Sequence, residues 1–349
     1  MNLQLSKINE FGFISQLTQG FQRSPNQLNG IHESDAELIH QTDGSYIAIT
    51  IDTLLEEYKL GIIRSPYIVG WSLIAHSLSD LAAVGADPIG LLNALILPRK
   101  PEKEWNENLF KGMQDSLSWH QTYCLGGDTS VGEESALSCV ALGRIPADRS
   151  PLTRLGAKLG DVFYITGPLG LGNQLAVAKR IDANLWASLE KRYLPKARLK
   201  EVLALRKWMK CAIDTSDALL QGMAILSALN GVGIRFEHRD ELYPPDLVEM
   251  AKKVNFPLWT INTFGLGEYE ILFAVEKNTE AEFLQDAAKK SIYVKKIGEA
   301  IKEPEIKLVL NNRDYTLDAP YLLNLLGQTS SIDEYYQKLM EYHAKLISR

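Results

Sequence analysis

The chain has 349 residues and a mass of 39.0 kDa, which is enough for two ordinary domains with hydrophobic cores. Hydrophobic residues make up 46% and charged residues 23% of it, a balance typical of globular proteins. The formal net charge of −6 argues against nucleic acid as a partner, because proteins that bind phosphate backbones normally present a basic face. The longest apolar runs, such as residues 91–97, are too short to cross a bilayer, so no membrane partner is expected.

The N-terminus and the cysteines both favour a cytoplasmic location. The first seven residues contain no basic stretch followed by an apolar one, so no secretory signal is expected. Cys124, Cys139 and Cys211 lie far apart and form no CxxC pair. Cys139 and Cys211 occur in apolar runs, which indicates small buried side chains in a reducing compartment.

In the first half of the chain, strands and helices are mixed. Residues 46–51 alternate in polarity and are rich in β-branched side chains, which predicts a strand that ends at Asp52. Ser65 and Pro66 are typical of a helix start, and apolar residues at helical spacing extend that helix to about Gly85. Further strands are predicted at 91–97 and 136–142.

The polar segment 146–151 is the predicted domain boundary, which gives domains at 1–148 and 149–328. The second of these begins with a strand at 161–166, a glycine-rich turn and a helix, and has later strands at 269–275 and 292–297. A helical extension at 329–349 opens with a capping box, Ser331 and Glu334. Its predicted apolar face, which we expect to pack on the body or on a partner chain, contains Ile332, Tyr335, Leu339, Tyr342 and Leu346.

The positions of the aspartates carry the chemical information. They stand at predicted strand ends, in turns beside glycines, or within a helix, at Asp35, Asp52, Asp80, Asp128, Asp214 and Asp217. Each alone has a structural explanation, since aspartate caps helices and ends strands. Together, beside glycines that let the backbone approach a ligand, they suit hard cations. Asp80 interrupts a small, apolar stretch, where an unpaired buried charge would cost several kcal/mol.

Other common site motifs are absent from the sequence. There is no GxxxxGK[ST] phosphate loop, no GxGxxG after a strand and no GxSxG elbow. The six histidines show no metal-ligand spacing, which gives zinc chemistry little support. The turn at 167–172, with Gly167, Gly170 and Gly172, could approach phosphates, although ordinary turn chemistry explains it equally well.

Seven blocks in order resemble the thiamine-monophosphate kinase family, from the superfamily that includes aminoimidazole ribonucleotide synthetase. The resemblance runs from about Phe11 to Gly298. Its blocks are SDA (34–36), IDTL (51–54), SDLAAVGA (79–86), GGDT (126–129), RLGAKLGD (154–161), DTSDAL (214–219) and EYEILF (268–273).

This resemblance implies a two-domain α/β (α+β) architecture with mixed sheets and helices, in which the N-terminal domain binds metal and ATP and pairs across a homodimer. ATP and several Mg²⁺ ions would lie in a cleft between the domains, next to a small phosphorylated acceptor. The positions that match metal ligands are Thr50, Asp35, Asp52, Asp80, Asp128 and Asp217. Gly127, Arg154 and Ser216 match nucleotide contacts, and Arg154, Asp128 and Asp217 would take part in catalysis. In the family reaction an anionic phosphate ester attacks the γ-phosphate of ATP, so positioning and charge neutralisation replace a strong general base.

Four positions depart from the family pattern. Ser34 replaces the first aspartate of a pair, and Ile51 replaces a threonine before Asp52. Residues 58–60, Tyr-Lys-Leu, stand where a histidine is expected, and Gly267 stands where the family has a glutamate. The last two positions belong to the acceptor side, for which Lys59 and Glu268 are the remaining candidates.

Three hypotheses follow from these matches and departures. The first is a thiamine-phosphate kinase with a drifted sequence. The second is a paralogue that acts on another small-molecule acceptor. The third is a non-catalytic nucleotide-binding or regulatory protein that keeps the same fold.

Overall fold

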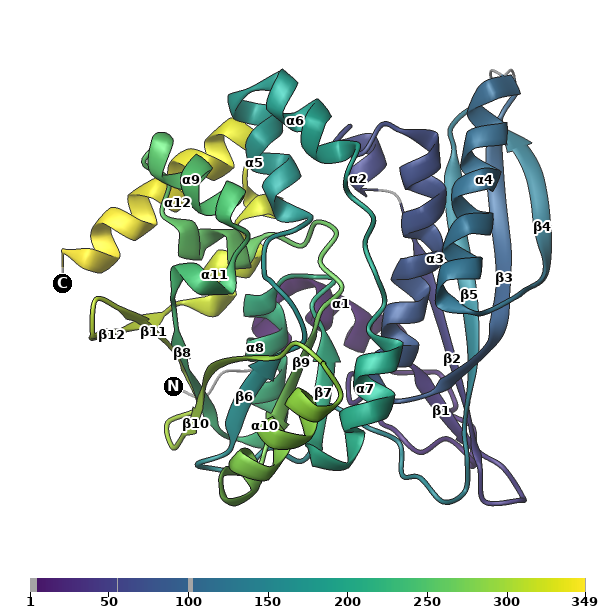
Figure 1. Cartoon of the computed structure of the whole chain (residues 1–349), viewed down its shortest axis with the longest axis horizontal. Coiled ribbons are helices and arrows are strands. Elements are labelled where there is room, and N and C mark those ends of the chain that lie inside the picture. Colours follow the sequence, from purple (N-terminus) through teal and green to yellow (C-terminus); the bar gives the residue numbers. More distant parts are fainter. Residues whose placement is uncertain (1–4, 55, 100–102, 349) are drawn as a thin grey trace.

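The computed structural model describes residues 5–54, 56–99 and 103–348, whose strands form two sheets (Figure 1). The first sheet has five strands in the order β1-β2-β5-β3-β4. Its strands are β1 (Glu37–His40), β2 (Tyr46–Thr53), β3 (Asp87–Pro98), β4 (Cys124–Gly132) and β5 (Ala136–Ile145). Only the β3–β4 pair is parallel, so this is a mixed sheet.

The second sheet has seven strands in the order β12-β11-β8-β10-β6-β9-β7. Its strands are β6 (Val162–Ile165), β7 (Met209–Asp214), β8 (Gly233–Glu237), β9 (Ile271–Val275), β10 (Lys295–Ile301), β11 (Ile306–Leu310) and β12 (Arg313–Leu317). It is also mixed, with one parallel pair between β8 and β11. The predicted α/β class with mixed sheets is therefore confirmed, while the domain boundaries at 148 and 328 stay predictions.

Helices cover both sheets and connect their strands. In the first half they are α1 (Asn9–Thr18), α2 (Glu56–Lys59), α3 (Pro66–Ala83) and α4 (Lys103–His120). In the second half they are α5 (Asn173–Ile181), α6 (Ala183–Glu190), α7 (Leu199–Leu205), α8 (Leu219–Asn230), α9 (Pro245–Lys253), α10 (Glu280–Lys289), α11 (Ala319–Asn324) and α12 (Ile332–Ile347). No helix in the described ranges is both long enough and apolar enough to span a membrane.

Helix α3 is the central element of the first half. It begins where the sequence predicts, with Ser65 as N-cap and Pro66 in the first turn, and ends two residues before Gly85. It packs against β2, β3 and β5 on one side and against α4 on another. Because both sides are covered, most of its residues are buried, which explains why its sequence is apolar almost all round.

Most of the predicted strands exist, but one is displaced. The strand expected at 292–297 begins at Lys295, since the chain first turns through a left-handed Ser291 and only then pairs with β6. Strand β4 was not predicted, because its residues are glycine-rich and mostly exposed and therefore lack an alternating apolar pattern. Cys139 and Cys211 are buried, as expected.

The C-terminal helix α12 also forms, with a modified cap. The Ser331 hydroxyl accepts a hydrogen bond from the Glu334 backbone N–H, as a capping box requires. The Glu334 carboxylate, however, accepts from the backbone N–H and hydroxyl of Ser330 instead of returning to Ser331. Along the predicted apolar face Tyr335 is buried, whereas Ile332 stays 42% exposed at the start of the helix.

The crossing of α3 and α4 depends on two glycines. A Cβ added at Gly112 would overlap the Tyr67 carbonyl oxygen, and one at Gly70 would overlap the Leu109 carbonyl oxygen. We expect Gly112→Ala to lower the free energy of unfolding by about 3 kcal/mol, because backbone atoms cannot move aside as a flexible side chain can. Chemical denaturation measures this loss. The control is Gly20→Ala, where no atom lies within 4 Å of the added Cβ and stability should be nearly unchanged; equal effects at both positions would contradict the packing argument.

Candidate active site

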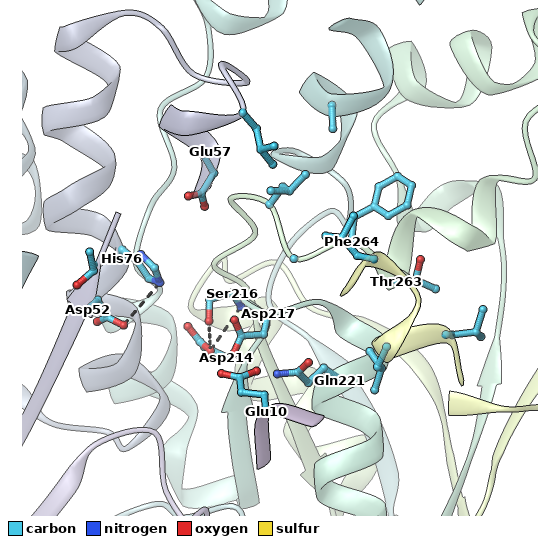
Figure 2. A pocket seen from close by; sticks show the side chains of 18 of the residues that line it. Glu10, Asp52, Glu57, His76, Asp214, Ser216, Asp217, Gln221, Thr263 and Phe264 are labelled. Carbon is cyan, nitrogen blue, oxygen red and sulfur yellow. Dashed lines mark hydrogen bonds and ion pairs between the residues drawn. The ribbon is translucent and has the colours of Figure 1, made fainter. Parts of the chain in front are cut away.

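A cavity of about 630 Å³ lies between the two sheets and the C-terminal helices. Strand β2 and helix α3 line one side, and the segment after β7 lines another (Figure 2). Carboxylates gather where β2, α3 and the segment after β7 line the cavity, whereas the opposite wall is apolar. The apolar part contains Phe264, Leu266, Leu322, Leu326, Tyr335 and Tyr336.

Three of the carboxylates converge from segments far apart in the chain. Asp35 comes from the loop before β1, Asp80 from α3, and Asp214 from the end of β7. One oxygen of each lies within 4.8 Å of the corresponding oxygens of the other two. Three carboxylates at this spacing repel one another unless a cation or protons lie between them, and oxygen ligands so arranged suit a hard divalent ion.

Arg154 is the cation that accompanies this cluster. Its Nη2 lies 3.1 Å from Asp35 Oδ1, in a pair whose side chains are only 15% and 2% exposed. Its Nη1 also donates to the His32 carbonyl oxygen at 3.1 Å. The Thr50 hydroxyl donates a hydrogen bond to Asp80. One guanidinium against three carboxylates leaves the cluster negative, so an ion of charge +2 would be balanced there.

The electrostatic cost of this crowding appears in the pKa values. Burial, reinforced by the charge of Asp35, raises the pKa of Asp214 to about 7. Burial and the charge of Glu10 raise the pKa of Asp217 to about 6. The pKa of Asp80 is raised well above its usual value, again by burial first and by neighbouring carboxylates second. A bound divalent cation would remove this cost by replacing the protons.

The cavity also contains buried polar atoms with no hydrogen-bond partner in the described structure. They include Asp52 Oδ2, Asp214 Oδ2 and His76 Nδ1. Unpaired buried polar atoms are rare in folded proteins, and their gathering in one place calls for a ligand. The donor set, rich in carboxylate oxygens, fits Mg²⁺.

The turn between β7 and α8 provides a second polar surface beside the cluster. The Ser216 hydroxyl donates to Asp214 Oδ1 at 2.9 Å, and both Ser216 and Asp217 line the cavity. Ala218, at the N-cap of α8, has φ = 100°, a conformation that favours glycine and strains a residue with a Cβ. The turn therefore has a shape that glycine adopts without strain, and Ala218 adopts it with local backbone strain.

The family models match in the same order as the two sheets. Residues 33–145 match the AIR synthase related protein, N-terminal domain, and residues 158–311 match the AIR synthase related protein, C-terminal domain. Thiamine-monophosphate kinase of Escherichia coli (strain K12) is 32% identical over 250 residues, which cover 69% of this chain and 74% of that protein. The chain belongs to the thiamine-monophosphate kinase family.

Further relatives extend the match over nearly the whole chain. Thiamine-monophosphate kinase of Buchnera aphidicola subsp. Schizaphis graminum is 29% identical over 332 residues, which cover 93% of this chain and 96% of that protein. The crystal structure of thiamine-monophosphate kinase from Stenotrophomonas maltophilia K279a superposes with a TM-score of 0.67 at 26% identity, covering 88% of this chain and 97% of that one. The structure named AaThiL, complexed with AMPPCP and TMP, has a TM-score of 0.71 at 22% identity. The match covers 90% of this chain and 99% of that one.

The fold brings most of the sequence-predicted residues into one cavity. The lining includes Asp35, Asp52, Asp80, Arg154, Ser216 and Asp217, and Thr50 reaches it through Asp80. Ile51, which replaces a family threonine, is 65% exposed, because successive strand residues point to opposite faces. Thr50 is thus the β2 hydroxyl that reaches the cluster.

Gly127 and Asp128 lie apart from this cavity, on the exposed strand β4. Across the sheet, Asp128 on β4 pairs with Ala94 on β3, and Ala94 pairs with Ser138 on β5. Ser138 in turn pairs with Thr53 on β2. Three inter-strand spacings of about 4.8 Å place Asp128 roughly 14 Å from β2. Asp128 therefore lies too far away to join the three-carboxylate cluster of its own chain.

Lys59 also points elsewhere. Its amino group lies 3.2 Å from the Glu134 carboxylate, and its side chain is 52% exposed. Both residues border a separate surface hollow. Among the described residues that line the active-site cavity, the basic groups are Arg154 and His76.

Glu268 is buried at the glycine-rich turn rather than in the carboxylate cavity. Its carboxylate accepts hydrogen bonds from the backbone N–H groups of Gly170, Gly172 and Asn173 at 2.9 to 3.1 Å. An anion at the N-terminus of α5 satisfies N–H groups that have no helical partner. The turn that could have approached a phosphate is thus already occupied by a carboxylate of the same chain.

A close contact with Tyr193 explains why position 267 is a glycine in this chain. Its φ is 70°, and an added Cβ would overlap the Tyr193 hydroxyl. That hydroxyl donates to the Gly267 carbonyl oxygen at 2.6 Å. A glutamate in this position, as in the family pattern, would require Tyr193 to move.

The sequence analysis names neither His76 nor Glu57 as a site residue. It counts Asp214 among the aspartates that suit hard cations, but the family resemblance does not include it among the metal ligands. His76 lies four residues before Asp80 on α3, a spacing that places both side chains on one helix face. Glu57, from the short helix α2, faces the same space (Figure 2). The four-residue spacing of His76 and Asp80 is the sequence signal that could have identified His76 as a residue of this cavity.

The raised pKa values predict how Mg²⁺ stabilises the protein as pH changes. The pKa of Asp214 is about 7, above the value of about 3.9 for an unfolded aspartate, so the folded state binds more protons between these values. Without metal, stability should therefore fall as pH rises through this window. Mg²⁺ must displace the protons, so the rise in melting temperature that it causes should grow from about pH 5.5 to about pH 8.

Differential scanning fluorimetry with and without Mg²⁺ measures this dependence. Asp214→Asn, which has no proton to lose at that position, should flatten it. A Mg²⁺ effect that is larger at the acidic end would contradict the assignment.

Proposed function

We propose that this chain is an ATP-dependent kinase that transfers the γ-phosphate of ATP to thiamine monophosphate and forms thiamine diphosphate. The observation that carries the proposal is the partly buried cluster of Asp35, Asp80 and Asp214 within one cavity, in which Asp35 is paired with Arg154. The similarity to proteins named thiamine-monophosphate kinase supports it.

The cluster residues, with Asp52 and Thr50, would hold Mg²⁺. When bound, Mg²⁺ neutralises the phosphate oxygens and the charge that develops on them during transfer. The carboxylates would hold the ion in a fixed position, because they come from three different segments of the chain and not from one loop. Asp217, at the same edge of the cavity, extends this set toward the N-terminus of α8.

Besides the metal ligands, Arg154 would help to position the phosphoryl group that is transferred. Its guanidinium is anchored on Asp35 and on the His32 carbonyl oxygen, which fixes its direction. A fixed cation beside the metal ligands stabilises negative charge on a transferring phosphoryl group without reorganisation. The Ser216 hydroxyl and the first backbone N–H groups of α8 lie nearby and suit phosphate oxygens. The acceptor phosphate is already an anion near neutral pH, so the site requires no strong base.

The apolar wall of the same cavity would take the acceptor's ring system. Phe264 and Tyr335 pack with ring centroids 5.5 Å apart, and Tyr335 comes from the C-terminal helix α12. Aromatic side chains at this position offer flat, apolar surface a short distance from the carboxylates (Figure 2).

One observation favours a second candidate, a kinase for a different small phosphorylated acceptor. Both residues proposed from the sequence to contact the acceptor are engaged elsewhere, Lys59 with Glu134 and Glu268 with the α5 N-terminus. Tyr193 occupies the space that a glutamate at 267 would need. The acceptor end thus differs from the family pattern more than the metal end does.

The deciding experiment follows ADP and thiamine diphosphate together, with Mg·ATP and with or without thiamine monophosphate. We expect both products to form in equal amounts and Asp80→Asn to lower kcat by about 100-fold or more, because it removes charge that positions the metal. The matched control is Asp246→Asn, an exposed carboxylate outside the cavity, which should leave kcat unchanged. Mg²⁺-dependent ATP binding without thiamine diphosphate would favour the second candidate.

We also propose a homodimer through the outer face of the first sheet. Helix α3 packs on one face of this sheet, and alternate residues point to the other. Several large apolar side chains are exposed on the strands and flanks of this sheet, including Ile51, Ile89, Leu92, Ile96, Leu125 and Val131. An apolar sheet face of this kind marks an interaction surface. Since Gly127 and Asp128 belong to the same sheet, any role of theirs in the nucleotide site would depend on that dimer.

Sedimentation equilibrium tests the dimer. The wild-type chain should sediment at twice 39.0 kDa, and Leu92→Glu should reduce the mass to 39.0 kDa because it buries a charge at the interface. Leu284→Glu is the control, since Leu284 is similarly exposed but lies on α10 in the second half. A wild-type monomer, or a dimer that Leu92→Glu leaves intact, would overturn this interface.

A further inference from the structure

His76 is the one imidazole among the described residues that line the active-site cavity. Helix α3 places it one turn before Asp80, so both side chains leave the helix on the same face. The Tyr269 ring packs against the His76 ring with centroids 5.2 Å apart, and the His76 side chain is only 17% exposed. The imidazole is therefore held in place at the edge of the carboxylate cluster (Figure 2).

The contact between His76 and Asp52 has the spacing of two ligands of one ion. His76 Nε2 lies 3.7 Å from Asp52 Oδ1, which is too long for a hydrogen bond. Two metal–ligand bonds of about 2.1 Å can span up to about 4.2 Å, so both atoms can reach the same ion. The other Asp52 oxygen, Oδ2, is buried with no hydrogen-bond partner in the described structure.

The other polar atoms of this pair are also unsatisfied. Asp52 Oδ2 and His76 Nδ1 are both buried and have no hydrogen-bond partner within the described ranges. Figure 2 shows the pair facing Asp214, a member of the all-oxygen cluster, across the cavity. A cation bound by His76 and Asp52 would therefore lie beside that cluster and reduce the number of unpaired buried atoms.

We propose that His76 and Asp52 form a mixed nitrogen–oxygen metal subsite beside the all-oxygen cluster, and that it favours a first-row transition ion such as Mn²⁺ over Mg²⁺. Imidazole nitrogen is a poor ligand for Mg²⁺, which prefers oxygen and loses its waters reluctantly. It binds first-row transition ions well, and affinity for them rises along the series. The chain would thus bind two kinds of divalent ion, because the His76 imidazole nitrogen is a ligand in one site and absent from the other. This inference rests on the metal-binding part of the proposed function and not on the identity of the acceptor.

The test is electron spin-echo spectroscopy of Mn²⁺ bound to the full-length chain in the absence of nucleotide. The wild-type protein should show ¹⁴N coupling typical of an imidazole ligand. His76→Asn should abolish the coupling and weaken the tightest Mn²⁺ binding by about 10-fold or more, while Mg²⁺ binding changes little. Asp52→Asn should weaken Mn²⁺ binding at the same subsite.

Two controls keep the result interpretable. His40→Asn removes an exposed imidazole outside the cavity and should leave the coupling intact. His76→Gln is a second variant, and melting temperatures show whether each variant is folded. A wild-type chain that binds no Mn²⁺, or binds it without nitrogen coupling, would overturn the proposal, as would coupling that survives in folded His76→Asn. The spectra are recorded without turnover, so they test the subsite separately from the kinase assay. Nitrogen coupling in a chain that forms no thiamine diphosphate in that assay would count against the kinase assignment and leave the metal subsite standing.

Discussion

The ion pair between Arg154 and Asp35 connects the two halves of this molecule at the point where its chemistry is concentrated. Asp35 precedes the first sheet, whereas Arg154 lies in the segment between β5 and β6 that leads into the second sheet. The backbone reinforces the contact, because the Arg154 N–H donates to the Glu33 carbonyl oxygen at 2.8 Å. Breaking one partner of a buried ion pair is costly, since it leaves the other charge without compensation. The pair therefore holds Asp35 where Asp80 and Asp214 converge.

Helix α3 determines what faces that pair. It is buried between the first sheet and α4, and the close glycine contacts at Gly70 and Gly112 fix its depth. A helix fixed in this way presents His76 and Asp80 to the cavity from a rigid scaffold. Rigid placement matters here because carboxylates whose pKa values are raised by burial would move apart if the surrounding packing allowed it.

The part of the structure that we propose to bind the acceptor is constructed differently. Its aromatic wall comes partly from α12, and its glycine-rich turn is filled by Glu268. Tyr193 fits only against a residue without a side chain at 267. These are coupled changes, since a glutamate at 267 and a tyrosine at 193 exclude each other sterically. Asp35, Asp52 and Asp80 thus line the carboxylate cavity, whereas Tyr193, Gly267 and Glu268 lie together at a separate hollow beside the glycine-rich turn.

The sequence by itself determined the ends of β2 and α3 to within about two residues and the strand-end aspartates that line the cavity. These features are local, because alternation, helical spacing and caps involve residues only a few positions apart. The fold class was implied by the seven sequence blocks that resemble a known family. The exposed strand β4 escaped detection, since it has glycines and no buried face.

Only the tertiary structure decided which of the candidates act together. It joined Asp214 to Asp35 and Asp80, brought His76 to Asp52, and directed Lys59 and Glu268 to other partners. Strand-end position is visible along the chain, but a side chain's neighbours depend on sheet order and on helix packing. Those arise from contacts between residues that lie far apart in the chain, for which a single sequence carries no periodic signal.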